Sequence, residues 1–327
     1  MKRRVVKLSK RAFIASIMKI VGNVNADMGI GTRIPLKKIL TWKQETRVFV
    51  SARCIRRCIR ERLFEKGFEI DPLHSVGRGE TQQLGDIGDP IRFIDDDIFG
   101  YLIPEEVPLK RSSPVKISHL ISLRHTEVKP EFAARFPREF LPEFATGFPV
   151  PFEIEVAEWL GRLEIIISDR IGRFEEDELR EEYKSRLEKR NGQYYLDNSE
   201  RTKRLKALLE VLIWEGWQFP RASQSPSVPE FNCSVIALTE HFVPIFGYVD
   251  VDKEDRLSYE KIDDLKKLYS PLIDHLFILD YQSARYRSFE RESGDTLKEE
   301  EEGELNSESI KHVIERVCEY IISSTKS

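Results

Sequence analysis

The chain has 327 residues, 40% of them hydrophobic, enough to bury one large core or two modest ones. No apolar run approaches the roughly 18 to 20 uncharged residues of a membrane span, so we expect a cytoplasmic protein with no membrane partner. The four cysteines are too few for a disulfide scaffold and lack the paired spacing of a zinc site. We therefore expect small buried cysteines, no bound metal and no cofactor.

The net charge of −4 hides a strong asymmetry along the chain. Residues 1–70 contain 18 Lys and Arg but 5 Asp and Glu, a net charge of +13, whereas the remainder carries −17. A segment this basic in an acidic protein indicates a polyanion partner at one place. The alternative is a basic segment that pairs with the acidic remainder of the same chain.

The first predicted elements are a strand over 12–21, a polar glycine-containing loop, a short strand at 47–51, and a helix that Ser51 caps and Gly67 ends. On this helix Ile55, Ile59 and Leu63 form a buried stripe. A second face carries four guanidinium groups at helical spacing, those of Arg53, Arg56, Arg57 and Arg60.

Residues 68–98 are rich in Gly and Asp and predict a loop-rich insertion outside the core. Strands follow near 112–125 and 151–168, then a helix near 201–217 and a strand at 232–238. The order βαββαβ predicts an α+β, RRM-like (ferredoxin-like) arrangement. Beyond it the segments VPIFGYVDV and HLFILDY flank an expected helix near 258–269. A solvated acidic linker over 290–306 and a C-terminal helix over 307–324 are expected to follow; an acidic nucleic-acid mimic is the alternative for the acidic run.

Several runs together resemble a known family. GNVNADMGIGTRIPLKK and RVFVSARCIRRCIRERL, then FGYL, RSSPVKISHLISLRH and GWQFPRASQSP, resemble in this order the DevR-type crRNA-binding backbone proteins of type I CRISPR complexes, called Cascade. The resemblance covers about residues 10–235, and its asparagine-rich loop and LKK pair look most like type I-B. It implies one RRM-like domain over 1–327 with a fingers insertion at 68–98 and a thumb hairpin at 126–152.

The same resemblance implies the partners. Copies of the protein would stack in a filament along one crRNA, which pairs with the target DNA strand. The other implied subunits are a small capping subunit, a large DNA-recognition subunit and the crRNA-processing subunit. Some relatives guide transposition instead of degradation, so transposition proteins are an alternative set of partners.

A protein that coats a guide RNA must hold phosphates regardless of sequence while leaving the base edges free to pair. Cations and polar donors suit that task. The cations that the resemblance places at the crRNA backbone are Lys37, Lys38, Arg47, Arg53, Arg56 and Arg57. Further contacts are expected from Asn23, Asn25, Ser51, Arg111, Arg221 and Gln224.

Two other classes of function stay open. An RRM-like ribonuclease would need an acid or a histidine, but Asp27 is a lone carboxylate, and His119 and His125 fit satisfied core or surface positions better. Asp95, Asp96 and Asp97 are consecutive, and in an extended chain they cannot all face one cation. A free-standing RNA-binding regulator would read bases with aromatic residues on its central strands, and the strand over 12–21 has no such pair. We therefore expect a protein that is not an enzyme.

The last pattern lies in the thumb segment, where phenylalanines recur every four positions among prolines that oppose a continuous helix. In an extended hairpin this even spacing predicts one aromatic face that packs on a neighbouring subunit or on nucleic acid. The alternative is a local aromatic core. The residues are Phe132, Phe136, Phe140, Phe144, Phe148 and Phe152.

Overall fold

The computed structural model describes residues 9–25, 28–29, 31–76, 83–104, 108–136, 148–220, 226–292 and 296–323, and shows a mixed chain of helices and strands. The helices are α1 (Ala52–Glu65), α2 (Ile94–Phe99), α3 (Glu181–Lys184), α4 (Asn198–Glu210), α5 (Tyr259–Tyr269) and α6 (Ser307–Ile322). The strands are β1 (Arg11–Gly22), β2 (Arg33–Ile34), β3 (Lys38–Leu40), β4 (Thr46–Val50), β5 (His74–Val76), β6 (Gln83–Gly85), β7 (Tyr101–Ile103), β8 (Leu109–Arg111), β9 (Val115–Ile117), β10 (Leu120–Ser122), β11 (Lys129–Arg135), β12 (Val150–Ser168), β13 (Arg173–Phe174), β14 (Glu188–Arg190), β15 (Gln193–Tyr195), β16 (Glu230–Thr239), β17 (His275–Asp280), β18 (Arg285–Glu292) and β19 (Thr296–Glu304).

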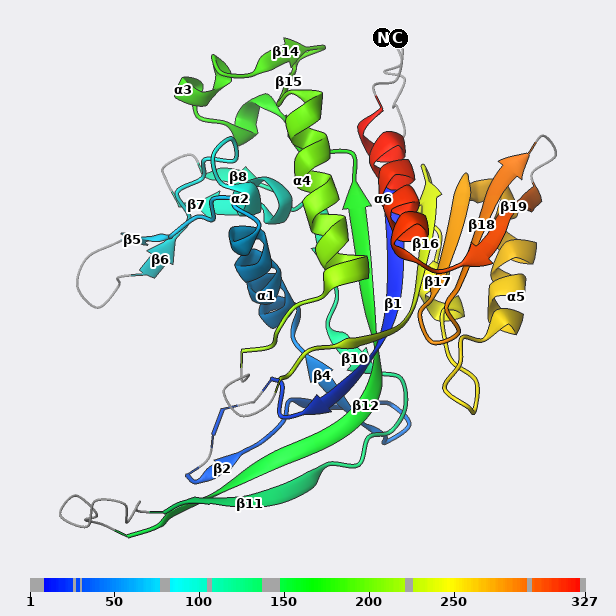
Figure 1. Ribbon diagram of the computed structural model, residues 1–327. Helices are drawn as coiled ribbons and strands as arrows, with labels where there is room; N and C mark the ends of the chain where they lie inside the picture. The colour runs from blue at the N-terminus through cyan, green and yellow to red at the C-terminus, as the bar shows by residue number, and fades with distance from the viewer. Residues whose placement is uncertain are drawn as a thin grey trace.

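One large sheet organises the molecule. Its order is β19-β18-β17-β16-β1-β12-β10-β4-β3, with β9, β11 and β2 also paired to β12. The central strand β1 is antiparallel to both β12 and β16. Strand β12 is 19 residues long, so one half lies in the body of the sheet while the other half continues outward and pairs with β11. The β11–β12 hairpin projects from the body as an arm (Figure 1).

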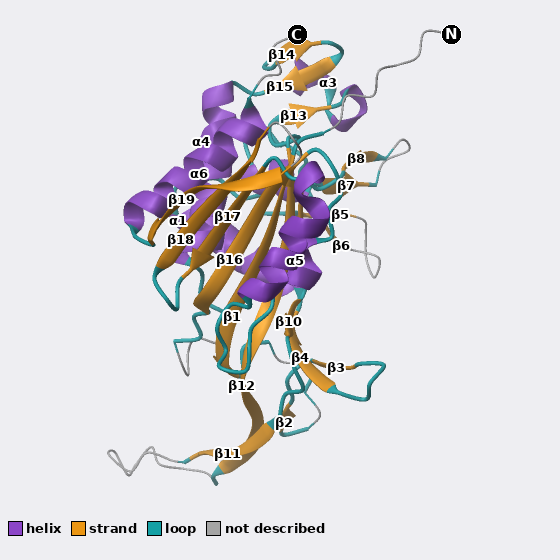
Figure 2. Ribbon diagram, turned by 90° about the vertical axis from the view of Figure 1, so that its right-hand side faces the viewer, coloured by secondary structure: helices purple, strands orange, loops and turns teal. Residues whose placement is uncertain are grey.

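Both faces of the sheet are covered by helices, which explains why β1 is apolar along most of its length. Ile14 and Met18 belong to the core cluster that includes buried residues of α1, α4 and α6. Phe13 and Ile17, which alternate with them, belong to the second core with α5. Figure 2 shows α5 in front of the sheet and the other long helices behind it. Among the described residues, no helix is both long and apolar enough to cross a bilayer.

Helix α1 confirms the prediction made for it. The Ser51 side chain accepts a hydrogen bond from the Cys54 N–H and caps the helix. Ile55, Ile59 and Leu63 are each fully buried. The four cysteines are all buried and free, as expected.

Helix α2 contradicts the expectation that residues 68–98 lie outside the core. Ile94 and Ile98 are buried in the same core as α1. Their i,i+4 spacing was obscured by the three aspartates between them, which are also buried. Two of these aspartates are paired with arginines, and a paired carboxylate is tolerated in an interior.

The acidic segment also differs from the prediction. The expectation of a linker over 290–306 is wrong, because Thr296–Glu304 forms the edge strand β19 antiparallel to β18. Leu297 is buried, while the glutamates lie exposed along the strand. Arg287 on β18 pairs with Glu299 at 2.7 Å. Charged side chains are tolerated here because a sheet edge faces water, where they also oppose pairing with another chain.

Candidate nucleic-acid interface

The two asparagines of the N-terminal loop connect it to the rest of the fold. Asn25 Oδ1 accepts a hydrogen bond from the Ser51 N–H at 2.9 Å, and the Asn25 carbonyl accepts from the Lys37 N–H at 3.3 Å. Asn23 Nδ2 donates to the Glu155 carbonyl at 2.7 Å. Asn23, Asn25 and Ser51 therefore position the loop beside the first turn of α1.

A buried carboxylate organises the same loop. Glu155 on β12 is 3% exposed and accepts hydrogen bonds from the Leu36 N–H at 2.9 Å and from Lys38 Nζ at 2.6 Å. Arg33 donates to its other oxygen at 2.8 Å. Burial raises the pKa of Glu155, but the hydrogen bonds from Lys38, Leu36 and Arg33 outweigh burial and hold the pKa below its usual value. Lys38 is therefore engaged with the protein, although a third of its side chain remains exposed.

The arginine face of α1 divides into exposed and packed members. Arg53 is exposed and has no ion-pair partner among the residues described. Arg57 is two-thirds exposed and pairs with Glu61 one turn along the helix. Arg56 and Arg60 instead lie over the ring of Phe99, and Arg60 also pairs with Asp95. Of these four arginines, the exposed one without an ion pair among the described residues, Arg53, lies at the N-terminal end of α1.

Positive charge converges on the first turn of α1. The helix has no acidic residue in that turn, so its N-terminal dipole is not compensated by a side chain. A hydrogen bond from Cys58 lowers the pKa of Cys54, burial opposes this, and the charges of Arg57 and Lys37 lower the pKa further. The loop and the helix therefore present cations to one place, which is the condition for binding a phosphate.

Arg47 and Arg111 lie in quite different environments. Arg47 pairs with Glu45 at 2.6 Å and donates to the Ser122 carbonyl, and about a fifth of its side chain is exposed. The side chain of Arg111 is completely buried and pairs with Asp97 at 2.7 Å and Glu178 at 2.9 Å. The prediction of an RNA contact at Arg111 is wrong, because its guanidinium cannot reach solvent.

The two histidines weighed as catalytic candidates accept backbone hydrogen bonds, and five other residues named in the sequence analysis lie outside the described residues. His119 Nδ1 accepts the Ala52 N–H at 2.9 Å, and His125 Nδ1 accepts the Thr46 N–H at 3.2 Å, which confirms them as satisfied surface histidines. Those that lie outside the described residues are Asp27, Phe140, Phe144, Arg221 and Gln224.

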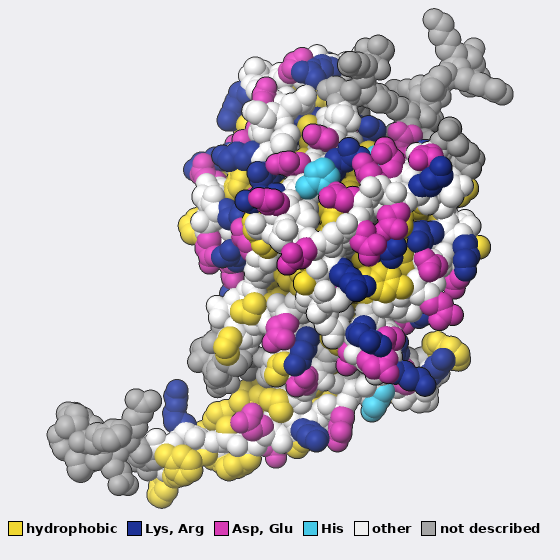
Figure 3. All heavy atoms as spheres, turned by 45° about the vertical axis from the view of Figure 1, so that its right-hand side comes forward, with side chains coloured by type: hydrophobic (Ala, Val, Ile, Leu, Met, Phe, Trp, Pro, Cys, Tyr) yellow, Lys and Arg dark blue, Asp and Glu magenta, His cyan; other side chains and the backbone are white. Residues whose placement is uncertain are grey.

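The arm exposes aromatic rings. Phe132 is 71% exposed, Phe136 66% and Phe148 92%, so these three rings do not form a local core. Figure 3 shows hydrophobic side chains gathered along the arm. The expectation of a single aromatic face is wrong, because Phe132 lies opposite Glu153 while Phe152 lies opposite Ala133. The register pairs even-numbered with odd-numbered residues, so the phenylalanines of β11 and β12 point to opposite faces.

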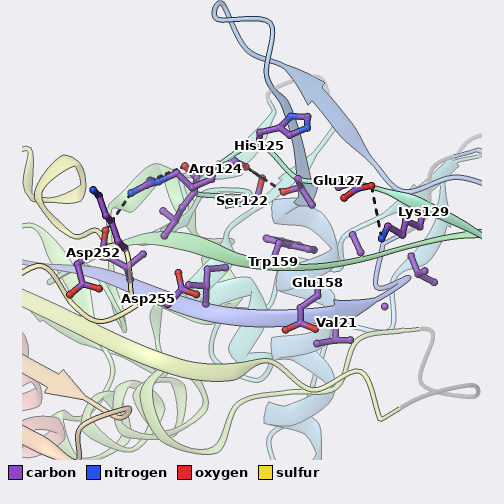
Figure 4. A pocket seen from close by; sticks show the side chains of 18 residues that line it. Val21, Ser122, Arg124, His125, Glu127, Lys129, Glu158, Trp159, Asp252 and Asp255 are labelled. Atoms are coloured by element: carbon purple, nitrogen blue, oxygen red, sulfur yellow. Dashed lines mark hydrogen bonds and ion pairs between the residues drawn. The ribbon is translucent and has the colours of Figure 1, made fainter.

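A cavity of about 820 Å³ lies where the arm leaves the body (Figure 4). Trp159 is 5% exposed at its wall, and its Nε1–H has no hydrogen-bond partner among the described residues. The wall carries cations such as Arg124 and Lys129 but also acids such as Glu127 and Glu158. With both signs present, this cavity attracts a polyanion less than the first turn of α1 does.

Sequence reasoning missed three residues of this region: Arg33, Glu155 and Trp42. Arg33 and Glu155 meet only through the pairing of β2 with β12, which no local pattern shows. Trp42 is 87% exposed at the tip of the β3–β4 hairpin and lies beside Lys43. The tryptophan in the polar turn TWKQE could have indicated an exposed ring on which a base can stack. Figure 2 shows this hairpin and the arm projecting in different directions.

A comparison with protein families shows the family to which this chain belongs. The family described as "CRISPR-associated negative auto-regulator DevR/Csa2" matches residues 85–258, more than half of the chain. This chain belongs to the DevR/Csa2 family. The match begins after the N-terminal loop and α1, so it does not test the RNA contacts expected from these two segments of this DevR-family protein. Among the curated proteins, none matches it.

One solved structure with a TM-score above 0.5 shows the same fold. A chain of a "CRISPR RNA-guided surveillance complex" is 11% identical with a TM-score of 0.51, covering 94% of this DevR-family protein and 99% of the other chain. A chain of a "CRISPR RNA-guided surveillance complex, pre-nicking" is 12% identical with a TM-score of 0.49, covering 80% and 87%.

Proposed function

We propose that this DevR-family protein is an RNA-binding backbone subunit of a type I CRISPR surveillance complex, in which several copies coat crRNA and present it for pairing with target DNA. The observation that carries the proposal is the positive charge at the first turn of α1, where Lys37 and Arg53 have no ion-pair partner among the described residues. Arg57, one turn further along, is two-thirds exposed although it pairs with Glu61. Sequence-independent phosphate binding needs such uncompensated charge.

The fold supports a more detailed assignment. The strand order β16-β1-β12-β10, with α1 between β1 and β10 in the chain and α4 between β12 and β16, fits an RRM-like palm. Within this proposal, residues 68–98 act as fingers and residues 126–152 as the thumb. The exposed rings of the thumb then pack on nucleic acid or on the next copy, because rings this exposed gain free energy by burial.

Co-expression with a CRISPR array and the companion Cascade subunits tests the proposal. We expect a purified assembly that holds several copies of this chain for each crRNA, with the RNA of one defined length. An assembly that forms with crRNA but without this chain would contradict the proposal. The subtype I-B assignment predicts that repeats of type I-B, rather than those of other subtypes, support this assembly.

The proposal also assigns no catalysis to this chain. We expect the purified protein not to cleave labelled RNA or DNA in the presence of Mg²⁺, and Asp27→Ala to leave target interference by the complex unchanged. Metal-dependent cleavage that disappears in Asp27→Ala would instead place the protein among the ribonucleases.

A further inference from the structure

The three consecutive aspartates of α2 have different surroundings. Asp95 accepts a hydrogen bond from Arg60 Nε at 2.7 Å. Asp97 pairs with Arg111 at 2.7 Å and with Arg204 at 3.0 Å. Asp96, which lies between them, has no ion-pair partner among the described residues, although it is 2% exposed.

Asp96 faces two other carboxylates instead of a cation. One ligand oxygen from each of Asp71, Asp86 and Asp96 lies within 4.8 Å of the others. Asp71 is also buried, at 6% exposed, and accepts hydrogen bonds from the Leu73 and Ile87 N–H groups at 2.7 and 2.6 Å. Asp86 accepts one from the Leu102 N–H at 3.0 Å. These donors are neutral amides, so they orient the carboxylates without cancelling their charge.

A second observation points to a missing ligand. Asp96 Oδ2 is buried and has no hydrogen-bond partner among the described residues. A buried polar atom without a partner is costly and rare. Asp71, Asp86 and Asp96 bring three carboxylates within 4.8 Å of one another, and two of them are buried. A cation at this place would relieve their mutual repulsion.

We propose that Asp71, Asp86 and Asp96 bind one divalent cation, Ca²⁺ in preference to Mg²⁺. Carboxylate oxygens are the ligands that both ions prefer, and an oxygen that accepts one N–H keeps a second lone pair for the metal. Mg²⁺ gives up its water ligands reluctantly and is usually bound through one or two carboxylates, whereas Ca²⁺ takes about six to eight oxygens in flexible geometry. A site that offers three carboxylates therefore fits Ca²⁺ better.

The proposed ion would join three separate segments. Asp71 precedes β5, Asp86 follows β6, and Asp96 lies on α2. The cation would therefore fasten both ends of the β5–β6 hairpin to a helix of the core. This inference concerns the chain itself and does not depend on the proposed RNA-binding function.

Calorimetric titration of the full-length chain, freed of RNA and treated with EDTA, tests the site with CaCl2 and MgCl2. We expect one Ca²⁺ per chain, weaker Mg²⁺ binding, and at least tenfold weaker Ca²⁺ binding in Asp86→Asn and in Asp96→Asn. Ca²⁺ should also slow hydrogen exchange in β5 and β6 of the wild type, but not of Asp86→Asn.

Asp252→Asn is the matched control, because Asp252 also accepts backbone N–H groups in a turn but lies outside the cluster. Its Ca²⁺ affinity should equal that of the wild type. Asp86 is only partly buried, so Asp86→Asn keeps the test decisive if Asp96→Asn fails to fold. Absence of saturable Ca²⁺ binding at millimolar concentration would overturn the proposal, as would equal affinity in the wild type and Asp86→Asn.

Discussion

At the scale of single residues, Glu155 is the carboxylate on which the loop before β4 depends. It accepts hydrogen bonds from Leu36, Lys38 and Arg33. We expect Glu155→Gln to lower the free energy of unfolding by about 1 to 3 kcal/mol, since a buried acceptor loses its charge while its cationic partners remain partly exposed. Urea unfolding at pH 7 measures this difference.

The effect of Glu155 depends on pH in a defined direction. Because the pKa of the folded state is lower than that of the unfolded state, the stabilisation is present above the unfolded pKa and is lost as pH falls through the folded pKa. The difference between wild type and Glu155→Gln should therefore be constant near neutral pH and shrink below about pH 4. A difference that grows on acidification would contradict this assignment.

Variants of Arg111 distinguish a structural role of this side chain from a role in RNA binding. Arg111→Ala removes a buried arginine that pairs with both Asp97 and Glu178, and we expect a loss of about 3 to 5 kcal/mol in unfolding free energy. Arg111→Lys keeps a charge but not the forked geometry, so it should lose less. RNA affinity per folded molecule should equal that of the wild type in Arg111→Lys, as fluorescence anisotropy would show; a specific loss of affinity would restore the predicted RNA contact.

Sequence reasoning located the cations but not their partners. Arg53 and Arg111 look alike in the sequence, as arginines near polar residues. Their difference arises from contacts between distant segments, such as Arg111 with Glu178, which tertiary folding alone brings together. Glu155 was missed for the same reason, because its partners are more than 100 residues away along the chain.

At the scale of elements, α1 carries the charge that the proposed function requires. We expect Arg53→Gln with Arg57→Gln to weaken binding of single-stranded RNA and to reduce the slope of log affinity against log salt by about 1.4, since each phosphate contact contributes about 0.7. The buried stripe of α1 is untouched, so thermal unfolding should not change. Arg56 is left intact because it lies over the ring of Phe99.

Arg256→Gln with Lys267→Gln is the matched control. Both side chains are well exposed, and Lys267 lies on α5, on the other side of the sheet from α1. This variant removes the same net charge, so its RNA affinity and salt slope should stay close to those of the wild type. Equal losses in the two variants would show that net charge, not the face of α1, holds the RNA.

An element is predictable from the sequence when the residues that determine it lie within the element itself. Helix α1 has a cap, a hydrophobic stripe and a terminal glycine within one segment, and it was predicted closely. Helix α2 was missed because it is six residues long, so its apolar stripe spans only one turn. In addition, the burial of its aspartates depends on arginines from other elements. Strand β19 was read as a linker because its glutamates form an edge strand only through pairing with β18.

At the scale of the whole molecule, the arm projects away from the body of the sheet (Figure 1). We expect replacement of residues 128–149 by a short Gly/Ser bridge to give a folded monomer that binds RNA weakly but forms no regular filament, because the exposed rings pack outside their own chain. Electron microscopy and analytical ultracentrifugation measure the two results. Loss of the folded monomer would favour a role of the arm in the core.

A variant that keeps the backbone of the arm distinguishes the effect of the aromatic rings from the effect of the arm as a whole. Phe132→Ser, Phe136→Ser and Phe148→Ser together remove exposed aromatic area and leave the pairing of β11 with β12 in place. We expect the monomer to stay folded and assembly to be lost, as in the deletion. Wild-type filaments from this variant would show that the rings do not make the contact.

The one-sided arm has a consequence for how an assembly ends. An arm that projects from one side and packs on a different surface of the next copy makes a heterologous contact, and such contacts do not close on themselves unless they form a ring. In the proposed filament, each added copy offers the same free arm as the last, so these contacts do not limit the number of copies. The length of such a polymer would be set by another molecule, such as a bound strand of fixed length.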